Sequence, residues 1–258
     1  MNLKYLRPAI GVAAAIAITA TMDATGLSAF SALPLFPLLV ALWFWERDSR
    51  YSVGFVWGTA RGYFLAVLYP VLVIGALVFI AAAAGKIDTT HTLWSRSLRN
   101  LVMMSVATIL VAIVTEEGFF RGWLWASLSR AGFGAATVLV LSSLAFSLWH
   151  ASFAVLDAGL DPASAQIPIY LLNAAIIGAV WGLLRWISGS VIVSSVSHGI
   201  WNGLTYILFG VGTRPGALGI AKAAMFGPET GILGLALNFV FAAALFVWWR
   251  NAQKATAQ

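Results

Sequence analysis

The sequence predicts an all-α protein, a polytopic transmembrane helical bundle of about eight membrane spans. Hydrophobic residues make up 61% of the 258 residues and charged residues only 9%. The apolar residues form long uncharged runs near the roughly 20 residues that cross the hydrocarbon core. This composition excludes a water-soluble domain. Since no repeat or change of composition divides the chain, we expect residues 1–258 to form a single integral membrane domain.

Eight apolar segments are the predicted spans. They are residues 8–22, 27–45, 62–84, 101–127, 134–153, 167–184, 191–208 and 232–249. The first is short and follows Lys4 and Arg7, so a cleaved signal peptide is the alternative interpretation of that segment. Asp23 follows it without a small-residue cleavage site, and a second long apolar run comes next. This order favours a retained span.

Two connections between the spans are long. Residues 86–100 form the most polar one, where we expect a short interfacial helix with Trp94 near the lipid headgroups. Residues 211–231 are rich in glycine and contain Pro215 and Pro228, which cannot donate backbone hydrogen bonds. We therefore expect a loop or a re-entrant connection there.

The basic residues predict the orientation of the chain. A net charge of +6 would suggest nucleic acid in a soluble protein, but here the Lys and Arg residues lie at the ends of apolar segments and no nucleic-acid partner is expected. One set of connections holds nine of them: Lys4, Arg7, Arg47, Arg50, Arg61, Arg130, Arg185, Arg250 and Lys254. The other set holds five: Lys86, Arg96, Arg99, Arg214 and Lys222. This bias places both termini in the cytoplasm.

The chain contains no cysteine. That absence excludes disulfides, thiolate nucleophiles, cysteine zinc sites and iron–sulfur clusters.

Few ionisable residues lie inside the predicted spans. Seven of the nine acidic residues fall in connections, whereas Glu116 and Glu117 sit side by side within the fourth span. His150 and His198 interrupt the fifth and seventh spans. Because an ionisable group is costly at bilayer depth, such residues mark a functional site that faces the protein interior or a wet cavity.

The spacing of these residues groups them on helical faces. Glu117 and Arg121 are four residues apart and can pair, while Glu116 points about 100° away. Four-residue steps also separate two further pairs, Phe146 from His150 and His198 from Asn202. A carboxylate, two imidazoles and an amide from three helices could form a hydrolytic centre, with a base to activate water and donors to stabilise an oxyanion.

The three strings EExxxR, FxxxH and HxxxN, in this order and each inside an apolar span, resemble the CAAX-protease and bacteriocin-processing family (CPBP, or Abi) of intramembrane proteases, which includes Rce1. The resemblance covers a protease-like core at about residues 101–208. It implies an endopeptidase that cleaves near a substrate terminus or a membrane-proximal segment. The implied partner is a peptide or protein, lipid-modified or membrane-anchored, and the implied location is the bacterial plasma membrane.

The resemblance also implies roles for the site residues. Glu116 and His150 would polarise the attacking water, and His198 and Asn202 would hold the oxyanion. Glu117 and Arg121 would brace the helix and tune Glu116 as supporting residues. Phe146, taken by itself, is expected to serve packing.

No cofactor is favoured by the resemblance, but a divalent metal such as zinc remains the alternative. Glu116, His150 and His198 could supply three zinc ligands and leave an open position for water. Against zinc, no HExxH pair lies on one helix.

Other interpretations of the buried polar residues stay open. A transporter or ligand-binding membrane protein could use the carboxylates to relay protons or bind a cation, but its expected paired repeats with broken helices are not visible. A non-catalytic family scaffold is a further alternative. Taken singly, the Glu117–Arg121 pair and the His198–Asn202 pair could also be structural contacts within or between helices.

Overall fold

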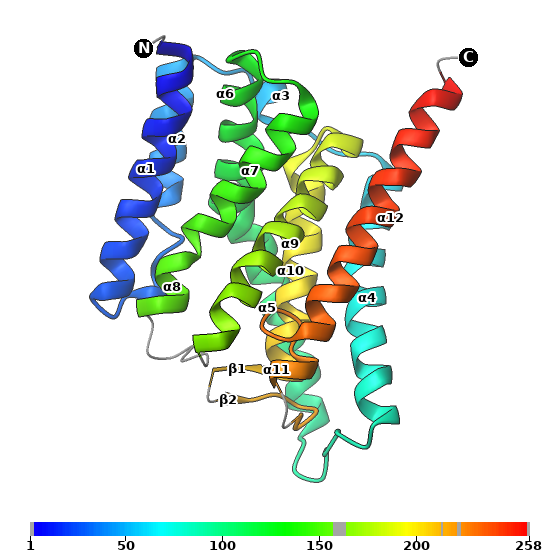
Figure 1. Cartoon of the computed structure of the whole chain (residues 1–258). Coiled ribbons are helices and arrows are strands. Elements are labelled where there is room, and N and C mark those ends of the chain that lie inside the picture. Colours follow the sequence, from blue (N-terminus) through cyan, green and yellow to red (C-terminus); the bar gives the residue numbers. More distant parts are fainter. Residues whose placement is uncertain (1–2, 157–163, 213, 221–222, 257–258) are drawn as a thin grey trace.

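A computed structural model describes residues 3–156, 164–212, 214–220 and 223–256 of the chain. The predicted all-α helical bundle is confirmed (Figure 1). Within the described residues, six helical stretches are long and apolar enough to cross a membrane. They are Leu3–Ala24, Ala60–Ala83, Trp94–Arg130, Ala135–Leu156, Ile167–Ser188 and Ile232–Lys254.

The remaining two predicted spans form shorter helices. Residues 27–45 contain a 3₁₀ turn, η1 (Ser28–Phe30), and the helix α2 (Leu35–Glu46). Pro34 occupies the N-cap position of α2. The residues before it form hydrogen-bonded turns that return the chain from α1. Residues 191–208 form α10 (Val191–Leu204), which continues as the π-helical turn η4 (Thr205–Phe209).

The other elements follow in chain order. The long helices are α1 (Leu3–Ala24), α4 (Ala60–Ala83), α5 (Trp94–Val114), α7 (Ala135–Trp149), α9 (Ile167–Ser188) and α12 (Ile232–Thr256). The short ones are α3 (Arg50–Val53), the π-helical turn η2 (Gly118–Trp123), α6 (Leu124–Arg130), α8 (Ala151–Leu156), the 3₁₀ turn η3 (Ser164–Gln166) and α11 (Ala223–Phe226).

The two long connections differ from a plain loop. Trp94 begins α5, so residues 94–100 are the first turns of a long helix instead of a separate interfacial helix. In the second connection, β1 (Gly210–Val211) and β2 (Arg214–Pro215) form an antiparallel hairpin, followed by α11. Lys222, which the orientation argument used, lies outside the described residues.

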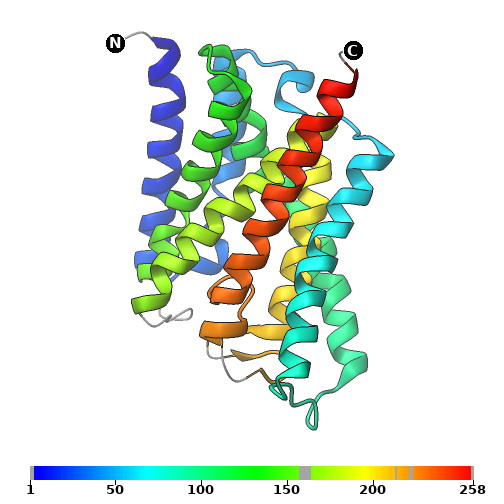
Figure 2. The ribbon, with the colours of Figure 1, turned by 45° about the vertical axis from the view of Figure 1, so that its right-hand side comes forward.

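The long helices run side by side, and both ends of the chain lie at the same end of the bundle (Figure 1). The β hairpin, α11 and the connection between α4 and α5 lie at the opposite end (Figure 2). The central helix α10 packs against α4, α5 and α9, and α12 packs against α4 and α9. The residues of α10 are therefore well placed to line an interior site.

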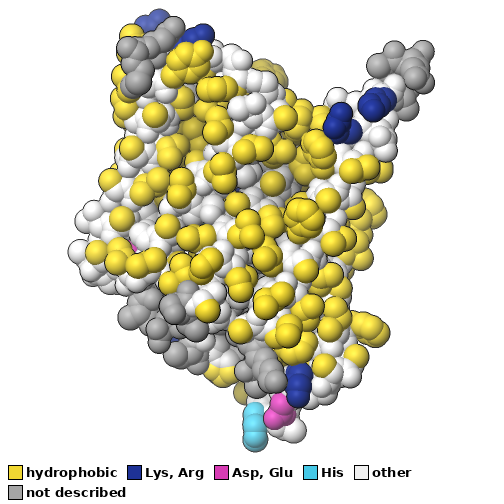
Figure 3. All heavy atoms as spheres, viewed as in Figure 1, with side chains coloured by type: hydrophobic (Ala, Val, Ile, Leu, Met, Phe, Trp, Pro, Cys, Tyr) yellow, Lys and Arg dark blue, Asp and Glu magenta, His cyan; other side chains and the backbone are white. Residues whose placement is uncertain are grey.

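Apolar side chains cover the face of the bundle seen in Figure 3, and most of the visible charged side chains lie at its two ends. Large hydrophobic residues are highly exposed on several helices, with Phe64 at 64%, Phe79 at 74% and Leu110 at 64%. An apolar surface of this extent is unfavourable in water but suits lipid. The chain is thus an integral, multi-pass membrane protein.

Polar caps fix the ends of the helices nearest the site. The Ser190 hydroxyl accepts a hydrogen bond from the Ile192 amide at 3.1 Å and starts α10. Gly189, with φ of 72°, ends α9 in the left-handed conformation that glycine adopts at little cost. This short connection makes α9 and α10 neighbours that pack against each other.

Candidate active site

The helix that carries the two adjacent carboxylates is interrupted just before them. Thr115 leaves the helical conformation, with φ of −112° and ψ of −103°, and its hydroxyl donates back to the Val111 carbonyl at 2.9 Å. The chain resumes helical form at Glu116 and then widens into the π-helical turn η2. Residues 101–127 therefore form a broken span, and π-helical turns within helices are frequent at functional sites.

Gly118 is the residue that permits this break. A Cβ atom at this position would lie 2.5 Å from the Ile113 carbonyl oxygen and 2.8 Å from the Leu39 side chain. No real Cβ atom tolerates such contacts. A glycine here lets the widened turn pack closely on both neighbours.

The four predicted catalytic side chains meet at one cavity. Glu116, His150, His198 and Asn202 all line an internal space of about 80 Å³, large enough for water molecules. Glu116 comes from the break after α5, His150 follows α7, and the other two lie on α10. Phe146 also lines this space. Three separate segments thus deliver the predicted groups to a shared site.

Glu116 and Glu117 face different partners. The Glu116 side chain retains 17% exposure and places Oε2 3.9 Å from His198 Nε2. The Glu117 side chain has no exposure, and His198 Nδ1 lies 3.1 Å from its Oε1. One imidazole therefore lies between two carboxylates, of which only Glu116 borders the cavity.

Arg121 pairs with Glu117 as predicted, with 3.2 Å between Nη1 and Oε1. Its Nη2 donates to the Gly178 carbonyl of α9 at 3.0 Å, and its guanidinium lies 4.1 Å from the centre of the Phe146 ring. The charged group is thus held by a carboxylate, a carbonyl and an aromatic face. The contact between Glu117 and His198 adds a task that the spacing alone did not suggest, because Glu117 fixes an imidazole of the site.

His150 has one nitrogen committed to the backbone. Its Nδ1 lies 2.9 Å from the Phe146 carbonyl oxygen, which can only accept, so this nitrogen carries the proton. The Phe146 ring also packs against the imidazole, with 4.3 Å between the ring centres. The second nitrogen, Nε2, then has a free lone pair that can accept a proton.

His198 is held from a second side by an aromatic ring. Trp181 of α9 stacks on the imidazole at 4.0 Å between ring centres, with 14° between the planes. Asn202 lies one turn further along α10 and borders the same cavity. Among the described residues, its side chain has no hydrogen-bond partner, which leaves the amide available to a bound molecule.

Three residues with ionisable side chains line the cavity but were not predicted from the sequence: Tyr170, Tyr206 and Glu229. Glu229 accepts a hydrogen bond from Trp201 Nε1 at 3.0 Å. It lies in the connection before α12, where a carboxylate beside proline and glycine has no periodicity to reveal which way it points. Burial raises the pKa of the Glu229 carboxyl, although the hydrogen bond from Trp201 opposes the shift.

A metal site would need three ligands at bonding distance. In the part of the chain that the structure describes, no three His, Asp or Glu side chains are arranged to hold a metal ion. The alternative zinc set of Glu116, His150 and His198 is therefore not assembled in this arrangement.

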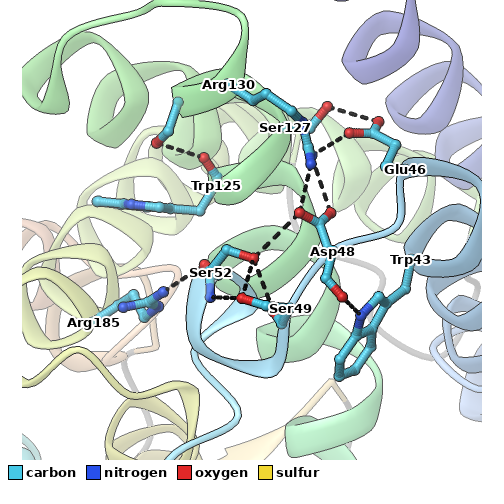
Figure 4. Close-up of polar contacts among 10 residues, drawn as sticks. Trp43, Glu46, Asp48, Ser49, Ser52, Trp125, Ser127, Arg130 and Arg185 are labelled. Atoms are coloured by element: carbon cyan, nitrogen blue, oxygen red, sulfur yellow. Dashed lines mark hydrogen bonds and ion pairs between the residues drawn. The ribbon is translucent and has the colours of Figure 1, made fainter.

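A group of polar residues ties the helices together at the end of the bundle that carries the termini (Figure 4). Arg130 forms ion pairs with Glu46 and with Asp48, the latter at 2.6 Å, and the Ser127 hydroxyl donates to Glu46 at 2.9 Å. These contacts join the end of α2 to α6.

Arg185 links this end of the bundle to the broken helix. Its Nη2 donates to the Ser52 carbonyl at 3.0 Å (Figure 4), and its Nε donates to the Arg121 carbonyl at 3.1 Å. A backbone oxygen in the π-helical turn is thereby satisfied by a side chain of α9. This contact helps to hold η2, and hence Glu116 and Glu117, in place.

Residues 98–204 match the family model described as type II CAAX prenyl endopeptidase Rce1-like. Over this segment, the chain is similar to a family of proteases. The resemblance seen in the sequence is confirmed for the part of the chain that holds all four predicted catalytic residues. Neither the curated proteins nor the solved structures yield a match to the chain.

The matched segment of this CAAX endopeptidase family begins near the start of α5 and ends at the last residue of α10. Glu116, Glu117, Arg121, His150 and the His198–Asn202 pair all fall within it. Tyr206 and Glu229 lie beyond its end. The matched segment therefore supplies most of the residues that line the cavity, and the later part of the chain supplies the rest.

Proposed function

We propose that this protein is an intramembrane endopeptidase in which water, activated by Glu116 and His150, attacks a peptide carbonyl whose oxyanion is held by His198 and Asn202. The observation that carries the proposal is the convergence of these four side chains on one cavity that has room for water. Similarity to a protease family over the same segment supports it.

Water activation requires proton acceptors beside the cavity. Glu116 offers a carboxylate, and His150 offers the lone pair of Nε2 because its Nδ1 is bound to a carbonyl. A positioned base of this kind typically contributes 10²–10⁴-fold to the rate. The two groups together orient a water molecule and take its proton as the oxygen attacks.

Oxyanion stabilisation requires donors on the same cavity. Asn202 supplies its amide N–H group. His198 donates from Nδ1 to Glu117, so it can serve the oxyanion through Nε2 when that nitrogen also carries a proton. A carboxylate lies on each side of the ring. Glu117 thus prepares His198 for its role.

The shape of the site limits the substrate. The cavity is small, but Tyr206 also borders a larger hollow of about 800 Å³ between the start of α5 and the β hairpin, at the end of the bundle opposite the termini. A peptide that approaches through this hollow must be extended to reach Glu116. We therefore propose cleavage near a substrate terminus or in a membrane-proximal segment, in a lipid-modified or membrane-anchored protein, and poor cleavage of folded soluble proteins.

The proposal is tested with purified protein in lipid nanodiscs. Wild type and Glu116→Gln are incubated with a library of prenyl-cysteine and membrane-anchored peptides, with and without a chelator, and mass spectrometry detects the products. We expect wild type to cleave a subset and Glu116→Gln to lose that cleavage. Chelation should leave the activity unchanged.

Two results would change the proposal. Equal cleavage by Glu116→Gln would remove the assigned base. Loss of activity on chelation, with recovery on added zinc, would replace the metal-free chemistry while the hydrolase function stands.

A further inference from the structure

Glu229 is a third carboxyl group in the site, beyond the family-matched segment. It borders the same cavity as Glu116, His198 and Asn202, but from the connection that precedes α12. One of its carboxyl oxygens accepts the hydrogen bond from Trp201 Nε1 at 3.0 Å. The other acid groups of the site have assigned tasks, whereas Glu229 has none.

A network of fully buried residues holds the backbone of Glu229. The Asn173 amide donates to the carbonyls of Pro228 at 2.7 Å and Glu229 at 3.0 Å. Asn238 donates to Asn173 Oδ1 at 2.9 Å and accepts from the Tyr69 hydroxyl at 2.6 Å. Residues from α4, α9 and α12 therefore fix one short turn.

The side chain of Trp201 is fixed as well. Its indole ring stacks on Tyr69 at 5.2 Å between ring centres, with 6° between the planes. Trp201, Tyr69, Asn173 and Asn238 all have 0% exposure. Such a buried polar network is stabilising only when it is satisfied, and it then defines one geometry. Here the geometry it defines presents a carboxyl group to the reaction cavity.

Charge limits the protonation of the two cavity carboxyls. Glu117 is paired with Arg121, which leaves Glu116 and Glu229 to share a cavity of about 80 Å³ with the imidazoles of His150 and His198. Two carboxylates in one small space do not readily both ionise. The group that accepts the water proton must be ionised, so Glu229 is the one that carries a proton.

Resting on the proposed function, we infer that Glu229 is the general acid that protonates the leaving nitrogen of the cleaved peptide bond. Water forms a bond to the carbonyl carbon as one of its protons passes to Glu116. The C–N bond then breaks, and the nitrogen takes the carboxyl proton of Glu229. One product is a carboxylic acid and the other an amine. Transfer of the proton from Glu116 to Glu229 through cavity water restores the starting state.

Two substrates with the same acyl part separate this role from a structural one. The first is a cleaved peptide amide found in the library, and the second is its p-nitrophenyl ester, whose leaving group departs without a proton. We expect Glu229→Gln to lower kcat for the amide by roughly 10²-fold or more, the range of general-acid catalysis. Its kcat for the ester should stay within about threefold of wild type. Glu116→Gln, which lacks the base needed for water attack, should lower both.

A second variant guards against misfolding. Glu229→Asp keeps an acid group and should retain more amide hydrolysis than Glu229→Gln. The two variants should have the same melting temperature. Equal losses on amide and ester for Glu229→Gln, or normal amide hydrolysis, would overturn the general-acid role. If wild type hydrolyses neither substrate, the proposed hydrolase function fails, and the role of Glu229 fails with it.

Discussion

At the scale of single residues, the adjacent acids Glu116 and Glu117 show how one step along a helix separates two tasks. Glu117 is fully buried against Arg121 and His198, whereas Glu116 borders the cavity. Neighbouring helical residues point about 100° apart, so one can face the protein while the other faces the reaction. We assign structure and positioning to Glu117 and chemistry to Glu116.

This division predicts the effect of Glu117→Gln. The substitution leaves the Arg121 guanidinium without its carboxylate, and breaking a buried pair in this way costs about 3–5 kcal/mol. It also removes the charged acceptor of His198 Nδ1. We expect both the melting temperature and the cleavage rate to fall, as measured by thermal unfolding and a peptide assay in the same detergent.

The double variant Glu117→Gln/Arg121→Met is the control. It removes the unpaired charge and should recover much of the stability, but not the activity, because His198 still lacks its partner. A Glu117→Gln protein as stable and active as wild type would contradict the assignment.

At the scale of elements, the break at Thr115 and the π-helical turn set the direction of the two carboxylates. The packing of Gly118 against the Ile113 carbonyl makes this break possible. Arg185 contributes from α9 by donating to a carbonyl within the turn. The broken helix is thus defined by contacts to other segments as well as by its own sequence.

Gly118→Ala tests this dependence. The added methyl group would meet a backbone oxygen at 2.5 Å, so the turn must shift. We expect a lower melting temperature and a loss of cleavage. Gly75→Ala in α4 is the matched control, since a Cβ there has nothing within 4 Å, and it should be neutral or slightly stabilising. Equal behaviour of the two variants would show that the break is not needed.

At the scale of the whole molecule, the site features that depend on local residue patterns are the ones that the sequence predicts. Polar residues inside apolar spans, together with the family resemblance, identified Glu116, His150, His198 and Asn202, which the fold brings to one cavity. Glu229 and the π-helical turn escaped, because each depends on contacts between distant segments. The position of Glu229, for example, depends on two asparagines. Asn173 lies 56 residues earlier on α9, and Asn238 lies on α12.

The orientation of the bundle is a further whole-molecule prediction. Both termini lie at one end, and the basic residues predict that this end is cytoplasmic. Because the chain has no cysteine, single cysteines can be labelled cleanly. We expect Lys86→Cys, at the end opposite the termini, to react with a membrane-impermeant maleimide added to intact cells. Trp57→Cys, in the connection between α3 and α4, should react only after the cells are opened. The reverse pattern would invert the orientation and the side from which the substrate arrives.

The central claim is that residues from three helical segments act as one hydrolytic unit. Its most direct test is kcat for Glu116→Gln, His150→Gln and the double variant on one cleaved peptide. We predict a loss of roughly 10²–10⁴-fold for Glu116→Gln, and a double variant little worse than the more damaging single change, because groups that act together are not additive. Near-normal turnover by Glu116→Gln, or losses that multiply in the double variant, would contradict the claim.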